Sequence, residues 1–245
     1  MFFARKSTVR QTLAYRLVVM LIKPWVFLFT RRDWRGTEQV RVGGPLIVCS
    51  NHISNFDVFA VAHYLHDNGR PPRFLAKSEL FRLPLLGWLL RACGQIPVYR
   101  GTSQAANALR DAEQALANGE TVVIYPEGTF THDPGLWPMT GLTGAARLAL
   151  ATGCPVVPLA QWGAQEVIPV EGRGLDLLGR HEMHLLAGAP IDFSDLLERG
   201  QEPAVLQEAT SRIMRAIADL LAELRGEPAP VTLWDRRVKP EVQEQ

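Results

Sequence analysis

Short apolar runs recur along this chain and alternate with segments whose apolar residues follow the period of a helix. The runs are four to seven residues long and cover 46–50, 73–76, 95–99, 121–125, 155–161 and 183–187. Runs of this length that lack polar alternation are typical of strands buried on both faces. The helical patterns cover 56–66, 83–92, 104–118, 144–151 and 204–225. This alternation predicts an α/β fold in which helices pack on the faces of a sheet.

The length of the chain and the composition of its two ends suggest one main domain with a flanking segment on each side. A chain of 245 residues is close to the size of one α/β domain, and we assign 37–225 to it. Residues 1–36 are rich in basic and aromatic side chains, so we treat them as a separate helical segment. Residues 226–245 are polar and interrupted by proline, which favours a flexible tail.

The net charge limits the possible binding partners, and the cysteine pattern indicates the cellular compartment. The 26 Lys and Arg residues oppose 25 Asp and Glu residues, which gives a formal net charge of +1. This balance argues against binding nucleic acid through general electrostatic attraction. Cys49, Cys93 and Cys154 lie in apolar surroundings and form no C-x-x-C pair. Such a pattern is typical of a reducing compartment and predicts no disulfide framework.

The apolar stretch at 13–29 resembles a membrane span, but Arg16, Lys23 and Pro24 interrupt it. A spanning helix needs about 20 consecutive apolar residues. We therefore interpret this stretch as a helix lying on the membrane surface, with aromatic rings at headgroup depth and cations against anionic lipid. The alternative is an N-terminal helix packed on the domain, with its basic face in water.

His52 follows the run at 46–50, and Asp57 comes five residues later, where a helix is expected to begin. Each residue has an ordinary explanation: Asp57 fits a capping box with Ser54, and His52 fits a buried histidine at a strand end. Alternatively, the Asp57 carboxylate holds one ring nitrogen of His52 and stabilises the imidazolium, so that the histidine acts as a general base. No G-x-S-x-G elbow accompanies the pair. The hydroxyl that it activates would then belong to a substrate.

Three further segments follow in order, namely Gly94-Gln-Ile-Pro-Val-Tyr-Arg100, Tyr125-Pro-Glu-Gly-Thr129 and Val156-Val-Pro158-Leu159. Together with Asn51-His52-x4-Asp57, they resemble the four sequence blocks of the glycerolipid acyltransferases, the PlsC-like 1-acylglycerol-3-phosphate acyltransferase family. Four blocks in order are far more specific than any one of them. The resemblance covers 45–159 closely and the remainder loosely. It implies an α/β fold with a mixed central sheet flanked by helices.

The resemblance also implies an activity, a location and partners. The family transfers a fatty acyl group from acyl-CoA or acyl-carrier protein to the hydroxyl of a lysophospholipid, at the cytoplasmic face of the cell membrane. The simplest acceptor is 1-acylglycerol-3-phosphate, and the product is then phosphatidic acid. His52 resembles the base of the family and Asp57 its orienting partner. The implied partners are the lipid membrane, the acyl donor and the lysophospholipid, and no bound cofactor is expected.

Four residues match blocks that the family associates with the acceptor, and one matches a block on the acyl-chain side. Arg100 matches a basic residue associated with the phosphate, and its planar guanidinium suits phosphate oxygens. Glu127, Gly128 and Thr129 match the block associated with the glycerol and phosphate part. A glycine in this turn also lets backbone N–H groups approach an anion closely. Pro158 matches the block assigned to the acyl-chain side.

Three positions depart from the family pattern, and they reduce the positive charge expected around the phosphate. Phe130 follows Glu-Gly-Thr where relatives typically carry arginine, and Thr140 and Leu142 occupy positions that are often basic. The remaining candidate cations are Arg100, Lys77, His132 and Arg147. Losing one charged contact costs about 1.5–3 kcal/mol. The alternatives are therefore another alcohol acceptor, such as glycerol 3-phosphate or a glycolipid, or a non-catalytic lipid-binding module.

Two histidine pairs raise the question of a metal site. His63 and His66 have a helical spacing that could place both on one face. His181-Glu-Met-His184 is not H-E-x-x-H and leads into an expected strand, where the two histidines point to opposite faces. We predict no metal site.

Overall fold

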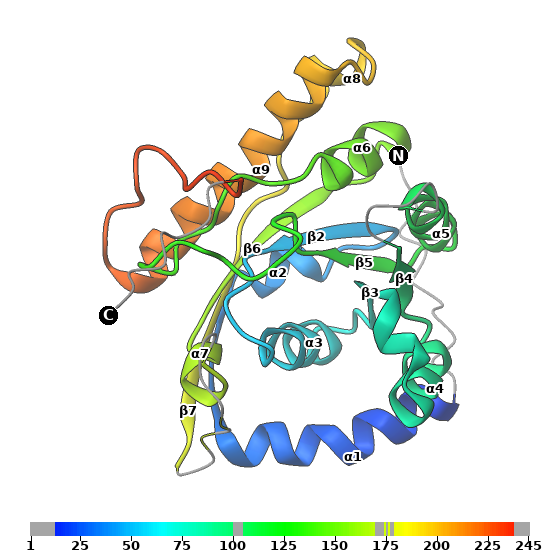
Figure 1. Cartoon of the computed structure of the whole chain (residues 1–245), viewed down its shortest axis with the longest axis vertical. Helices are drawn as coiled ribbons and strands as arrows, with labels where there is room; N and C mark the ends of the chain where they lie inside the picture. Colours follow the sequence, from blue (N-terminus) through cyan, green and yellow to red (C-terminus); the bar gives the residue numbers. More distant parts are fainter. Residues whose placement is uncertain (1–12, 100–104, 170–173, 175, 177–178, 238–245) are drawn as a thin grey trace.

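The chain folds around a mixed sheet that carries helices on both faces (Figure 1). This computed structural model describes residues 13–99, 105–169, 174, 176 and 179–237. Within the described residues the strands form one sheet of seven, in the order β1-β7-β6-β2-β5-β3-β4. The five strands from β6 to β4 run parallel, whereas β7 is antiparallel to β6 and β1 is parallel to β7. The predicted mixed central sheet flanked by helices is confirmed.

The elements follow the predicted alternation, with several short additions. The strands are β1 Thr30–Arg35, β2 Leu46–Ser50, β3 Pro72–Lys77, β4 Ile96–Val98, β5 Thr121–Ile124, β6 Val156–Trp162 and β7 His181–Ala187. The longer helices are α1 Leu13–Phe29, α3 Asp57–Asp67, α4 Pro84–Ala92, α5 Ala105–Ala117, α6 Gly144–Thr152 and α9 Pro203–Arg225. The short helices are α2 Thr37–Val40, the 3₁₀ helix η1 Ser78–Arg82, α7 Ala164–Val167 and α8 Ser194–Leu197.

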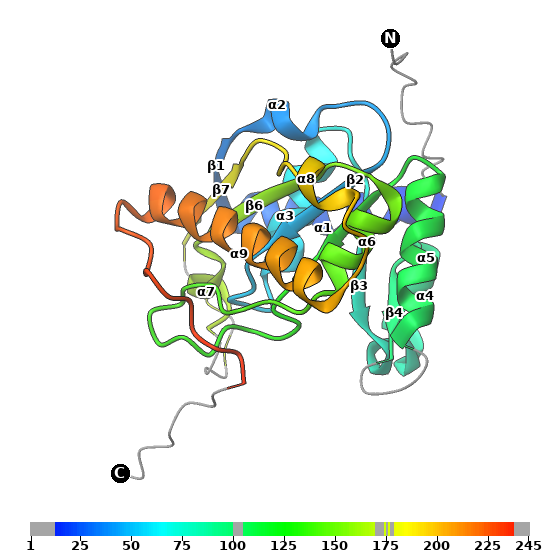
Figure 2. The same ribbon diagram turned by 90° about the horizontal axis from the view of Figure 1, so that it is seen from above.

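Strand β2 lies at the centre of the sheet and is buried along its whole length. Because side chains alternate along a strand, Ile47 and Cys49 face one side of the sheet and Leu46 and Val48 face the other. The first pair packs in a core with α5, α6 and α9, and the second in a core with α3 (Figures 1 and 2). Burial on both faces explains why this strand is readable as an apolar run.

Strand β1 was not predicted, and it changes the boundary of the domain. Its sequence, T-R-R-D-W-R, is mostly charged, so it carries no apolar signal. It nevertheless pairs with β7 from Thr30 opposite His181 to Arg35 opposite Leu186. Residues 30–35 are therefore part of the sheet, which corrects the boundary that we placed after residue 36.

Helix α1 contacts α3 and α4 and runs directly into β1 (Figure 1). Only Val26 of this helix is buried, and the side facing away from the domain carries apolar residues. These include Leu17, Leu21, Trp25 and Leu28, all exposed. Across the described part of the chain, no helix has both the length and the apolarity to cross a bilayer.

Residues 226–237, for which we expected a flexible tail, make specific contacts. The backbone N–H of Thr140 donates to the carbonyl of Trp234 at 2.8 Å, and Met139 forms a bridge with Trp234. Arg215 on α9 donates to the carbonyl of Pro230 at 2.8 Å. These backbone and side-chain hydrogen bonds correct the expectation for this segment, while 238–245 lie outside the described residues.

Candidate active site

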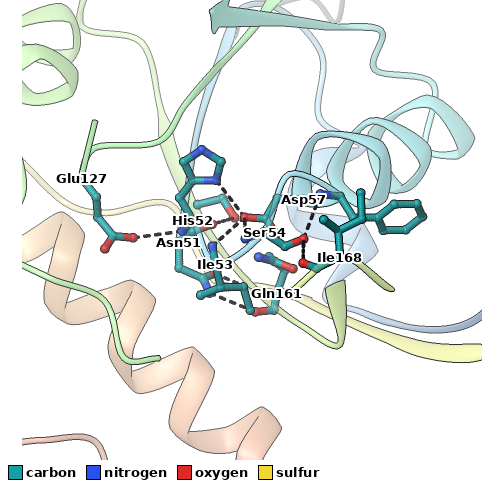
Figure 3. Close-up of polar contacts among 10 residues, drawn as sticks. Asn51, His52, Ile53, Ser54, Asp57, Glu127, Gln161 and Ile168 are labelled. Atoms are coloured by element: carbon teal, nitrogen blue, oxygen red, sulfur yellow. Dashed lines mark hydrogen bonds and ion pairs between the residues drawn. The ribbon is translucent and has the colours of Figure 1, made fainter. Parts of the chain in front are cut away.

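The site is built where β2 ends, between its neighbours β5 and β6. Asn51 follows the strand and exchanges two hydrogen bonds with the backbone of Gln161 on β6 (Figure 3). Its amide nitrogen donates to the Gln161 carbonyl at 3.0 Å, and its amide oxygen accepts the Gln161 N–H at 2.9 Å. This double contact fixes the chain immediately before His52.

The structure brings His52 and Asp57 together across the turn between β2 and α3 (Figure 3). The Nδ1 atom of His52 lies 2.8 Å from Oδ2 of Asp57. The Asp57 side chain is fully buried, whereas the His52 side chain is 17% exposed. A neutral imidazole held in this way carries its proton on Nδ1 and presents Nε2 as the basic nitrogen.

Asp57 also has the structural role that we considered as the alternative. Its Oδ2 atom accepts the backbone N–H of Ile53 at 2.6 Å and that of Ser54 at 2.9 Å. The Ser54 hydroxyl accepts the N–H of Phe56 and donates to the carbonyl of Ile168. The carboxylate therefore closes the turn at the start of α3 and orients His52 at the same time. The two interpretations of Asp57 are compatible.

Opposing effects act on the Asp57 carboxyl. Burial raises its pKa, while the contact with His52 and the N–H groups of Ser54 and Ile53 act to lower it. Hydrogen bonds to a carboxylate favour its charged form, and a charged partner does the same. These three donors therefore offset the cost of burying the charge of the Asp57 carboxylate.

Two aromatic rings enclose the imidazole of His52. The Tyr125 ring stacks on it with the centroids 4.3 Å apart and an interplanar angle of 18°. The Phe130 ring lies at the same centroid distance and is tilted by 53°. Phe130, one of the positions that depart from the family pattern, therefore contacts the imidazole of His52.

Glu127 is fully buried, and its side chain contacts the main chain of two residues, of which Figure 3 shows His52. One carboxylate oxygen accepts the N–H of His52 at 2.9 Å and the other accepts the N–H of Met139 at 3.0 Å. Burial raises the pKa of Glu127 to about 8, although both hydrogen bonds act to lower it. The resemblance associates this residue with the acceptor, and in the structure its carboxyl group lies against the backbone of His52.

The turn after Glu127 contains the other residues of this block. Gly128 has a φ of 72°, which favours glycine, and its N–H donates to the Tyr125 carbonyl at 3.0 Å. A Cβ atom at Gly128 would lie 2.7 Å from Cδ1 of Leu142, so the Leu142 side chain lies directly on the turn. Thr129 is partly buried between Gly128 and Phe130. Two of the departing residues, Phe130 and Leu142, are therefore neighbours of this turn.

The remaining predicted residues do not all converge on the imidazole. Lys77 is exposed at the end of β3. Pro158 is buried in β6, where it pairs with Cys49 and faces Gly188 and α9. Arg147 donates to Gln201, away from the turn. Arg100 lies outside the described residues.

The histidine pairs considered for metal binding have other partners. His63 packs edge-on against Trp34, and His66 Nδ1 lies 3.1 Å from the Tyr15 hydroxyl. His184 pairs with Asp33 at 2.8 Å. Among the residues that the structure describes, no group of three His, Cys, Asp or Glu side chains could hold a metal ion.

Sequence reasoning missed two features of the site. It did not place Tyr125 on the imidazole, and it did not find the link between Glu127 and the His52 backbone. The available signal was that Tyr125 ends the apolar run at 121–125 and that Glu127 comes two residues after it. In a parallel sheet, residues that follow neighbouring strands meet at the same edge, and here β2 and β5 are neighbours.

The chain belongs to the Acyltransferase family, whose sequence profile matches residues 31–162. This match covers more than half of the chain and includes His52, Asp57, Glu127 and Tyr125. It is consistent with the PlsC-like family to which the four sequence blocks pointed.

Individual relatives extend this comparison. The chloroplastic 1-acyl-sn-glycerol-3-phosphate acyltransferase BAT2 of Brassica napus is 27% identical over 168 residues, which cover 68% of this chain and 46% of the relative. The lyso-ornithine lipid O-acyltransferase of Pseudomonas aeruginosa is 31% identical over 127 residues, which cover 50% of this chain and 46% of the relative. The chain thus spans about half the length of the curated relatives it matches.

A solved structure supports the fold. The crystal structure of the 1-acyl-sn-glycerophosphate (LPA) acyltransferase PlsC from Thermotoga maritima matches with a TM-score of 0.66. The alignment covers 88% of this chain and 83% of that chain at 24% sequence identity. At this identity the likeness establishes the architecture, and the chemistry has to be argued from the site.

Proposed function

We propose that this protein is a membrane-associated O-acyltransferase that moves a fatty acyl group to the free hydroxyl of a lysophospholipid. The donor is a thioester, either acyl-CoA or acyl-carrier protein. The observation that carries the proposal is the 2.8 Å contact between His52 and a fully buried Asp57. Membership of the Acyltransferase family supports the same class of reaction.

The reaction follows from the orientation of His52. Asp57 holds Nδ1, so Nε2 takes the proton of the acceptor hydroxyl while that oxygen attacks the thioester carbonyl. The tetrahedral intermediate collapses by breaking the carbon–sulfur bond, and the thiolate leaves and takes up a proton. Asp57 stabilises the imidazolium during these steps. A base positioned in this way contributes about 10² to 10⁴ in rate.

The acceptor is most simply 1-acylglycerol-3-phosphate, which gives phosphatidic acid. The names of relatives such as the Brassica napus enzyme support this choice. The candidate ligands of the acceptor phosphate are Lys77, the last residue of β3, and Arg100, which comes two residues after β4 in the sequence. Thr129 and the Gly128 turn lie beside the base.

A different acceptor is the second candidate, and a specific observation favours it. Phe130 lies on the His52 ring and Leu142 lies on the Gly128 turn, so apolar side chains border the base at two positions. An acceptor without a phosphomonoester would fit such a border. The relative named lyso-ornithine lipid O-acyltransferase is an example of a family member with another acceptor in its name.

The exposed apolar face of α1 supports binding to a lipid surface. Leu17, Leu21, Trp25 and Leu28 are exposed on one helix, and exposed apolar patches of this kind mark interaction sites. Helix α4 packs against α1 and exposes Leu85 and Trp88 as well. We place the protein at the cytoplasmic face of the cell membrane, where α1 and α4 dock on the headgroups.

The test is an acyl-transfer assay with the purified protein, acyl-CoA or acyl-carrier protein, and lysophosphatidate presented in vesicles. His52→Ala is expected to lower kcat by about 10² to 10⁴. His184→Ala is the matched control, because His184 also pairs with a carboxylate at 2.8 Å but on β7. If His52→Ala retains wild-type turnover, His52 is not the base. If the wild-type protein transfers no acyl group to lysophosphatidate, glycerol 3-phosphate or an uncharged lysolipid, the protein is a non-catalytic lipid-binding module and not an enzyme.

A further inference from the structure

The two oxygens of the Asp57 carboxylate have very different surroundings. Oδ2 receives His52 Nδ1 and the backbone N–H groups of Ile53 and Ser54, at 2.6 to 2.9 Å. Oδ1 is buried and has no hydrogen-bond partner among the described residues. A buried acceptor without a donor is destabilising, because it has lost its hydrogen bonds to water. Within the described part of the chain, one of the two Asp57 oxygens therefore lacks a donor.

Tyr125 offers a hydroxyl that is also buried without a partner among the described residues. Its ring directly follows β5 and stacks on the His52 imidazole, with the centroids 4.3 Å apart. The Phe74 ring lies nearly parallel to the Tyr125 ring, with the two ring centroids 6.3 Å apart. Burial raises the pKa of the Tyr125 hydroxyl well above its usual value, and the charge of Asp57 raises it further. The hydroxyl is thus a protonated donor that experiences the Asp57 charge.

We propose that Tyr125 is a positioning residue of the His52–Asp57 pair, whose hydroxyl donates to Oδ1 of Asp57 through one water molecule. The contact holds the carboxylate in the orientation that keeps Nδ1 of His52 hydrogen-bonded. This inference rests on the proposed function, because it assigns Tyr125 a part in keeping the base ready for the acceptor. Stacking alone would be provided equally well by phenylalanine, whereas the buried hydroxyl needs an acceptor.

Gln161 is the competing donor, because both atoms of its buried side-chain amide lack a partner among the described residues. Its side chain lies beneath the turn from Asn51 to Ser54 (Figure 3). Its backbone is tied to Asn51, whereas the Tyr125 ring is in contact with the imidazole that Asp57 orients. The contact with the imidazole favours Tyr125.

The experiment removes only the hydroxyl oxygen. Tyr125→Phe keeps the stacked ring and is expected to lower kcat about tenfold, with unchanged KM for donor and acceptor, because the group acts on the base and not on substrate binding. In an Asp57→Asn background the same change is expected to have no further effect, since the two groups act as a unit. Tyr64→Phe is the matched control, because it removes a hydroxyl that donates to the Arg35 carbonyl at 2.9 Å, away from the base.

A second measurement separates this inference from the proposed function, because it needs no turnover. In NMR spectra the Nδ1 proton of His52 is expected to be protected in the wild type, and to exchange faster in Tyr125→Phe but not in Tyr64→Phe. An unchanged Nδ1 proton in Tyr125→Phe overturns the proposal. So does wild-type kcat in Tyr125→Phe, or a loss of kcat in Gln161→Leu alone. Absence of turnover in the wild type, with a changed Nδ1 proton, overturns the enzyme assignment and leaves Tyr125 as the partner of Asp57.

Discussion

The carboxyl group of Glu127 accepts the backbone N–H of His52 at 2.9 Å, so a buried acidic side chain supports the main chain of His52. Its second oxygen accepts the N–H of Met139. The carbonyl of His52 in turn accepts the N–H of Thr131 at 2.8 Å. The backbone of His52 is thus held on both sides by the segment that follows β5, and movement of this segment would displace the imidazole.

The raised pKa of Glu127 predicts a pH dependence of stability. The pKa of Glu127 is about 8 in the folded chain, against 4.5 when the side chain is exposed in the unfolded chain, because burial disfavours the charged form. Between these values the folded state binds more protons, so the free energy of unfolding is highest below pH 4.5 and falls as the pH rises toward 8. The contribution of this group is about 3–5 kcal/mol. Urea unfolding at several pH values measures it.

The matched variant for this prediction is Glu127→Gln, which cannot ionise. The part of the pH dependence of stability between pH 5 and 8 that comes from ionisation of Glu127 is expected to disappear in this variant. The free energy of unfolding at pH 5 is expected to fall by about 1–3 kcal/mol, because one backbone N–H loses its acceptor. Equal slopes for the two proteins would show that Glu127 has an ordinary pKa.

A cation at position 142 is expected to favour acceptors that carry a phosphomonoester. Leu142 lies on the Gly128 turn, so lysine at this position adds a charged donor beside the turn. A charged contact of about 1.5 kcal/mol raises kcat/KM for lysophosphatidate about tenfold relative to an uncharged lysolipid. Leu142→Met serves as the control of similar size. An equal change for both acceptors in Leu142→Lys would place the acceptor headgroup elsewhere.

Charges on the apolar surface of α1 and α4 are expected to weaken vesicle binding. Leu21 and Trp88 are exposed, and burying such a side chain in lipid contributes about 1.5–3 kcal/mol. Leu21→Glu and Trp88→Glu should each reduce partitioning onto anionic vesicles at least about tenfold. Val231→Glu is the control, since Val231 is also exposed but lies after α9. Equal losses in all three variants would exclude this surface.

Asp67 is expected to hold α1 on the domain. Its carboxylate pairs with Lys23 on α1 at 2.6 Å and with Arg32 on β1 at 3.1 Å. These cations are partly exposed, so Asp67→Asn is expected to cost about 1 kcal/mol and to increase hydrogen exchange within α1. Asp195→Asn breaks an exposed pair with Arg212 and should leave exchange in α1 unchanged. Unchanged exchange in Asp67→Asn would show that other contacts hold the helix.

The central strands and the His52–Asp57 pair could be predicted because their signals are local. Strand β2 is buried on both faces and therefore apolar throughout, and His52 and Asp57 lie five residues apart at one turn. The position of Glu127 depends on a contact with the His52 backbone, 75 residues earlier in the sequence, and no local pattern shows where its carboxyl group points. The apolar run that marks most of the strands is absent from β1, which is mostly charged and whose pairing depends on β7.

The pairing of β1 with β7 has a consequence for biosynthesis. Thr30 is made long before His181, its partner in the sheet. During translation the apolar helix α1 therefore leaves the ribosome while the strand that anchors its end does not yet exist. A nascent chain halted before residue 181 contains the apolar helix α1 but not β7, so this helix can meet a bilayer or a chaperone before the sheet is complete.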